Sequence, residues 1–109
     1  MDKNELMDRI FKMPTAIFNA EMALFNSQSE LAKAKEALAA KEADLYTEGK
    51  IDGKNAEIRN AQMRQLTTPE RNEIAKAENS LNLARIALSR QQNEFTAYKA
   101  IAGMLKGAE

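Results

Sequence analysis

The sequence has no cysteine and no histidine among its 109 residues. Without cysteine, the chain forms no disulfide and offers no thiol nucleophile. Without histidine, it lacks the side chain that most often acts as a general base or as a transition-metal ligand. The remaining residues form no recognisable set of nucleophile, base and orienting group. We therefore predict that the protein is not an enzyme and has no catalytic, cofactor-binding or metal-binding residues.

An excess of charge of one sign is also missing, because sixteen lysines and arginines balance sixteen aspartates and glutamates. A balanced chain produces no overall field that favours nucleic acid or an anionic membrane. No apolar run approaches the ~20 residues of a membrane span. The opening MDKNELMDRIFKM lacks the long apolar core of a signal peptide. We expect a cytoplasmic protein with neither a membrane partner nor a small-molecule substrate.

What the sequence does contain is a seven-residue repeat of large aliphatic side chains. In the first half of the chain the repeat consists of Ile10, Ile17, Leu24, Leu31, Leu38 and Leu45. Three residues after the first five of these stand Met13, Ala20, Ser27, Ala34 and Lys41. In this pattern a large residue is followed three positions later by a second seam residue, which is usually small, and four positions after that by the next large residue. Such spacing is typical of a coiled-coil seam in which two helices approach closely.

The same repeat returns in the second half of the chain. Its large positions are Ile74, Leu81, Leu88 and Phe95, followed three residues later by Ala77, Ala84, Gln91 and Tyr98. Two long helices with matching seams predict an all-α fold, a long antiparallel coiled-coil helical hairpin with a short helix at the turn. The whole chain, residues 1–109, is expected to form this single helical domain.

Prolines and glycines predict where the helices begin and end. Pro14 disfavours helical geometry at Met13, so we expect a kink or a break there, although the repeat continues across the proline and the helix could run through it. Gly49 is the expected cap of the first long helix, and Asp52 the expected cap of the short one. The predicted segments are an N-terminal amphipathic helix at 1–13, a long helix at 15–48, a turn with a short helix at 49–68 and a long helix at 69–103.

Antiparallel pairing of the two repeats predicts a register as well. If Leu45 lies near Ile74 and Leu24 lies near Phe95, the numbers of facing residues sum to about 119. In that register Ile10 faces the last residue of the chain, so residues 1–13 have almost no helix of their own chain to lie on.

A second apolar row runs one residue after the first seam, with Phe11, Phe18 and Phe25 at seven-residue spacing. It lies ~100° around the helix from the seam, so one partner helix cannot cover both rows. Either the C-terminal aromatic residues and the N-terminal helix bury the row, or it is an interface. We favour an interface that makes the protein a homodimer or higher oligomer. The predicted interface residues are Met7, Ile10, Phe11, Phe18, Met22 and Phe25.

The predicted turn is mildly basic. Four basic residues against two acidic ones, Asp52 and Glu57, give residues 49–66 a net charge of +2. Such a tip could contact phosphates, but it has no aromatic residue to stack on bases, and a solvated connector is the favoured interpretation. The candidate nucleic-acid contacts are Lys50, Lys54, Arg59 and Arg64.

The middle of the chain, LAAKEADL at 38–45 followed by GKIDGKNAEIRNAQ at 49–62, resembles small helical proteins of bacteriophages and prophages. Those proteins tend to be encoded in early regions beside single-strand annealing and replication proteins. The resemblance includes no catalytic motif and implies a phage protein in the host cytoplasm. We predict a non-enzymatic, oligomeric accessory or inhibitor that acts on a protein of DNA replication or recombination or on a host defence protein. The alternative is direct nucleic-acid binding through the basic tip.

Overall fold

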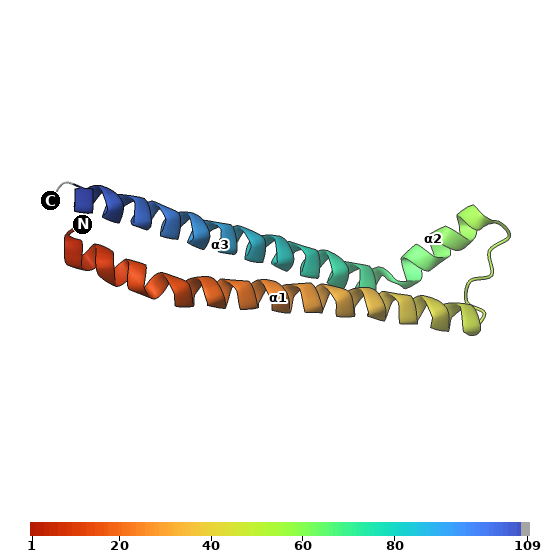
Figure 1. Cartoon of the computed structure of the whole chain (residues 1–109). Coiled ribbons are helices and arrows are strands. Elements are labelled where there is room, and N and C mark those ends of the chain that lie inside the picture. The colour runs from red at the N-terminus through yellow and green to blue at the C-terminus, as the bar shows by residue number, and fades with distance from the viewer. Residues whose placement is uncertain (108–109) are drawn as a thin grey trace. The chain divides into compact units, whose positions relative to one another are not determined.

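The computed structural model describes residues 1–107 and consists of three helices joined by short connections (Figure 1). Helix α1 spans Lys3–Thr47, α2 spans Ala56–Leu66 and α3 spans Thr68–Gly107, with no strand in this part of the chain. The chain divides into two compact units. Unit 1 contains Met1–Asn26 together with the chain from Asn82 onward, and unit 2 contains Ser27–Leu81.

In each unit a stretch of α1 lies beside a stretch of α3 that runs in the opposite direction (Figure 1). Unit 2 also contains α2, which follows the turn. This arrangement confirms the predicted all-α antiparallel helical hairpin with a short helix at its turn.

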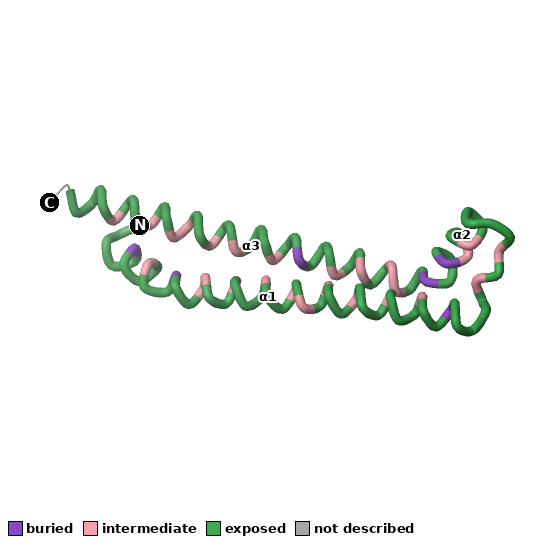
Figure 2. The backbone as a smooth tube through the Cα atoms, turned by 45° about the vertical axis from the view of Figure 1, so that its right-hand side comes forward, coloured by how far each residue is buried: buried purple, intermediate pink, exposed green. Residues whose placement is uncertain are grey.

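The two seven-residue repeats mark the buried sides of both long helices, as predicted (Figure 2). The large residues of each repeat are half-buried or buried, and Leu45 and Leu81 are among the most buried side chains of the described chain. Lys41 departs from the pattern, because it is exposed while the neighbouring Glu42 is half-buried. An unpaired ammonium group is costly to remove from water, which keeps Lys41 off the seam.

Helix α1 runs without a break through Pro14. The predicted separate helix at 1–13 and the predicted break near Met13 are therefore wrong. A proline inside a helix costs about 3 kcal/mol, because it removes one backbone hydrogen bond and crowds the preceding turn. Leu6 and Met13, which precede the proline, are buried, and Ile17, which follows it, is half-buried. Full burial of a side chain of this size contributes about 1.5–3 kcal/mol. Burial on both sides of the proline offsets its cost and keeps the helix continuous.

The register differs from the predicted one. Arg9 Nη1 donates a hydrogen bond of 3.2 Å to the Tyr98 hydroxyl, and Leu6 lines a hollow together with Ala102. The residue numbers of these facing pairs therefore sum to 107 or 108. The boundaries between the two units agree with this, because residue 26 of α1 and residue 82 of α3, which also sum to 108, both end unit 1. The predicted sum of about 119 is wrong by about three helical turns.

Between residues 20 and 34 of α1, the observed register sets large seam residues against small ones. A sum of 108 pairs Leu24 with Ala84, both in unit 1, and Leu31 with Ala77, both in unit 2. The predicted register would have set large residues against large ones, such as Leu45 against Ile74 and Leu24 against Phe95. A large residue opposite a small one fills each layer evenly and lets the helices approach, which favours this register over the predicted one.

The turn begins at Gly49, as predicted. Its φ of 71° is left-handed, and the amides of Gly49 and Lys50 donate to the carbonyls of Tyr46 and Leu45 at 3.1 and 3.0 Å. These two hydrogen bonds close the C-terminus of α1, and glycine adopts the required left-handed backbone angle without steric cost.

The N-cap of α2 is Asn55, whose side chain accepts a hydrogen bond of 2.9 Å from the Ile58 amide. The predicted cap, Asp52, is wrong, because its carboxylate instead accepts a hydrogen bond of 2.8 Å from the Gln62 side chain. Helix α3 also extends past the predicted end at residue 103, so Gly103 lies inside it.

Between α2 and α3 the chain continues with a single residue, Thr67, which is fully buried. Its hydroxyl donates to the Met63 carbonyl at 2.7 Å and accepts from Arg71 Nε at 2.9 Å. Pro69 then falls in the first turn of α3, where its missing amide hydrogen costs nothing. Thr67, whose buried hydroxyl makes both of these hydrogen bonds, therefore anchors the α2–α3 junction.

Candidate interaction surface

The second apolar row of α1 is exposed over the whole of its length. The exposed fractions are 87% for Phe11, 59% for Phe18 and 62% for Phe25. Met7 and Met22 extend the row and are also exposed. These five residues, all in unit 1, form what we call the phenylalanine face. The alternative that the chain buries this row itself is therefore wrong.

The exposure follows from the position of each phenylalanine one residue after a seam residue. Ile10, Ile17 and Leu24 turn toward α3 and are half-buried. A rotation of ~100° per residue carries the next side chain to the flank of α1, beyond the reach of α3. Ile10, predicted both as a seam residue and as an interface residue, is half-buried on the seam side of α1.

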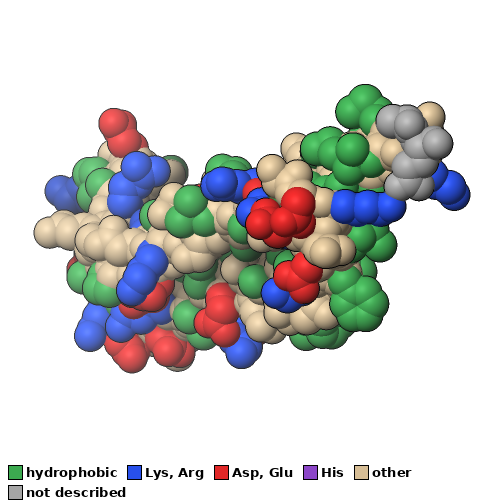
Figure 3. Space-filling model, turned by 90° about the vertical axis from the view of Figure 1, so that its left-hand side faces the viewer, with side chains coloured by type: hydrophobic (Ala, Val, Ile, Leu, Met, Phe, Trp, Pro, Cys, Tyr) green, Lys and Arg blue, Asp and Glu red, His purple; other side chains and the backbone are tan. Residues whose placement is uncertain are grey.

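From Met13 onward, the stretch of α1 that carries the phenylalanine face is also poor in charge. Residues 13–29 contain one charged residue in seventeen, Glu21, although 29% of the whole chain is charged. The outer face of a surface helix normally carries charged side chains. Exposed aromatic and methionine side chains with few charges among them have the composition of the core of a protein–protein interface. Figure 3 views the molecule from the end that holds the termini and shows hydrophobic side chains reaching the surface there.

Charged residues fix the N-terminal margin of this face. Asp8 and Lys12 form an exposed ion pair of 2.9 Å, one helical turn apart. Arg9 lies 6.0 Å from the centre of the Tyr98 ring. The hydrogen bond to the Tyr98 hydroxyl is the largest cause that raises the pKa of Arg9 above its ordinary value. Arg9 therefore joins the first turns of α1 to α3.

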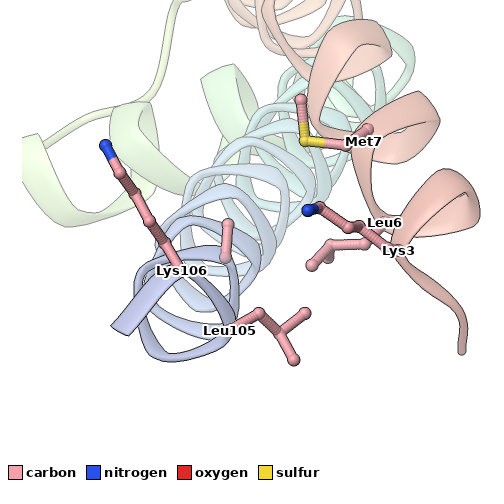
Figure 4. Close-up of a pocket in the computed structure, with 6 residues that line it drawn as sticks. Lys3, Leu6, Met7, Leu105 and Lys106 are labelled. Carbon is pink, nitrogen blue, oxygen red and sulfur yellow. The ribbon is translucent and has the colours of Figure 1, made fainter. Parts of the chain in front are cut away.

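A hollow of about 310 Å³ lies next to the face, where the start of α1 meets the end of α3 (Figure 4). Leu6, Met7, Ala102 and Leu105 give it an apolar lining, and lysine stems complete its wall. Met7 therefore borders both the hollow and the phenylalanine face. The hollow extends the apolar surface of unit 1 toward the ends of its helices.

The tip of the hairpin is more ordered than a solvated connector. Arg59 is half-buried, and its Nη1 donates to the Gly53 carbonyl at 3.1 Å. Gln62 accepts from the Gly53 amide at 2.9 Å, which holds the loop against α2. Lys50 pairs with Glu48 at 3.3 Å. Of the four predicted nucleic-acid contacts, Arg59 is half-buried, whereas Lys50, Lys54 and Arg64 are exposed.

Sequence reasoning missed two features that the structure reveals. Glu70 Oε1 is buried and has no hydrogen-bond partner among the described residues. The signal was its position seven residues before Ala77, which places it on the seam. Leu83 and Ile86 are exposed on α3, and their signal was that they fall outside the repeat.

The chain matches no family model, no curated protein and no solved structure. Within residues 1–107, no helix has both the length and the apolar character that crossing a membrane requires. The candidate site therefore rests on the geometry and composition of the chain itself.

Proposed function

We propose that the protein is a non-enzymatic interaction protein that acts through the phenylalanine face. In this proposal it is an oligomeric accessory or inhibitor in the host-cell cytoplasm. Its target is a protein of phage DNA replication or recombination, or a host defence protein. The exposed, charge-poor phenylalanine face is the observation that carries the proposal. The class of target comes from the resemblance of residues 38–62 to phage helical proteins.

The free energy available at this face supports a binding role. Fully burying a large apolar side chain contributes about 1.5–3 kcal/mol, and Phe11, Phe18 and Phe25 each keep more than half of their surface exposed. Their spacing of seven residues sets them in one row on α1, so a single helix laid along that row covers all three. A partner helix is therefore the kind of surface that fits.

Direct nucleic-acid binding through the tip is supported less well. Lys50 is paired with Glu48, and Arg59 is committed to the Gly53 carbonyl. The exposed Lys50, Lys54 and Arg64 are few, and so small a number of phosphate contacts supplies little of the electrostatic free energy on which nucleic-acid binding depends.

Capture from phage-infected cells tests the proposal. The bait proteins are the wild type, the double variant F11D/F18D and the control L83D, which adds a charge at an exposed leucine of α3. We expect the wild type and L83D to retain the same phage or host protein and F11D/F18D to lose it. Equal retention by all three would show that the face is not the contact. Salt-sensitive retention of DNA by the wild type would instead favour the tip.

A further inference from the structure

We infer that the surface covering the phenylalanine face is a second copy of this chain, with α1 of each copy antiparallel to the other about a twofold axis near Phe18. This inference rests on the proposed function, because it assigns an occupant to the same face. It goes further by fixing the partner, the direction of the helices and the residue at the centre.

The three phenylalanines of the face are spaced symmetrically about Phe18. Phe11 and Phe25 each stand seven residues away from it, and Pro14 and Met22 each stand four residues away. In a twofold interface residue i meets residue j and residue j meets residue i. An antiparallel pair centred on Phe18 therefore sets Phe11 against Phe25, and Pro14 against Met22, on both sides of the axis.

The charges of the face select the antiparallel direction. Asp8 and Glu21 lie one helical turn from the phenylalanines, on the same side of α1. The antiparallel arrangement sets Glu21 against Thr15 and Asp8 against Gln28, whose hydroxyl and amide groups can donate hydrogen bonds to carboxylates. A parallel arrangement would set Glu21 against Glu21, and like charges in direct opposition are destabilising.

The exposed area is large enough for a specific dimer. From the exposed fractions of its five residues, the face offers roughly 600 Å² per chain when a large side chain presents about 200 Å². Two such faces bury roughly 1,200 Å², which reaches the lower end of the range for specific interfaces. The hollow beside Met7 adds apolar surface at the margin of the face.

Disulfide cross-linking tests the arrangement, because the chain has no cysteine of its own. The variants T15C and E21C leave every residue of the phenylalanine face intact. In the inferred dimer, position 15 of one copy faces position 21 of the other, whereas equal positions are offset by about 9 Å along the helix. A disulfide does not span that distance. We expect an equimolar mixture to form a cross-linked dimer under mild oxidation, and each variant alone to remain largely uncross-linked.

Two controls sharpen the result. I86C, on the exposed part of α3, should not cross-link to either variant, and F18D added to both should abolish the cross-link. A disulfide formed by T15C alone or by E21C alone would overturn the antiparallel arrangement. A wild-type mass near 12.2 kDa by light scattering at micromolar concentration would overturn self-association. The proposed function would still be decided separately, by whether F11D/F18D loses the captured protein that the wild type and L83D retain.

Discussion

Glu70 is a polar residue at a position that the seam reserves for an apolar one. Its Oε1 is buried without a partner among the described residues, which costs about 1–3 kcal/mol. Glu70 lies in the first turn of α3, where the favourable interaction of its carboxylate with the helix dipole stabilises the fold by only about 0.3–1 kcal/mol. The burial cost is the larger effect, so we expect E70M to raise the free energy of unfolding by about 1 kcal/mol. Urea denaturation measures this, with the exposed E73M as control, and a destabilised E70M would contradict it.

Two glycines in different surroundings should respond oppositely to the same substitution. Gly103 lies inside α3 with nothing near its absent side chain, so G103A should stabilise by about 0.5–1 kcal/mol through helix propensity. A Cβ at Gly53 would lie 2.6 Å from Ile58 Cγ2 and 3.0 Å from the Arg59 nitrogen. G53A should therefore destabilise by about 1–3 kcal/mol, in the range of other overpacked sites. Thermal melts that shift in the same direction for both variants would exclude this account of the tip.

Between the elements, the register is the property that can be tested most directly. Ala34 lies across from Ile74 in the observed register, because their numbers sum to 108. A34L should destabilise by overpacking and I74A by leaving a void, each by about 1–3 kcal/mol. The double variant restores the volume of that layer, so the two effects should couple by about 1 kcal/mol or more. The pair A34L with L88A, which do not face each other, should be additive.

The two seams were predictable from the sequence, whereas the register between them was not. A seven-residue repeat identifies which side of a helix is buried, and that side is nearly unchanged when a helix slides by eleven residues, or about three turns. The repeats are therefore compatible with sums of both 119 and 108. The choice depends on the pairing of large with small residues and on where the turn reverses the chain, and neither is visible in the period.

The candidate site was predictable only in part, for a related reason. The spacing of Phe11, Phe18 and Phe25 indicated a row separate from the seam, and the structure confirms that the row is exposed. Ile10 was assigned to the interface because the wrong register left the N-terminal residues without a helix beside them. The break at Pro14 was predicted from local geometry, and burial of Leu6 and Met13 outweighs that geometry.

Across the whole molecule, the register sets how far apart in the chain the contacting residues are. Arg9 and Tyr98 are 89 residues apart, whereas all contacts of unit 2 lie within residues 27–81. Closing a longer loop costs more entropy, so unit 1 should open more readily than unit 2. Hydrogen exchange should show slower amide exchange in residues 68–81 than in 82–103 at a concentration where the protein is monomeric. Uniform protection along α3 would contradict this order.

The scarcity of charge on the phenylalanine face also determines how assembly through it responds to conditions. Burial of apolar surface near room temperature is driven by entropy and carries a negative change in heat capacity, so it weakens on cooling. Contacts between charges are instead weakened by salt. Association through this face should therefore decrease from 25 to about 5 °C and change little between about 0.05 and 0.5 M sodium chloride. Analytical ultracentrifugation over these ranges measures both, and the opposite pattern would indicate an interface held by charge.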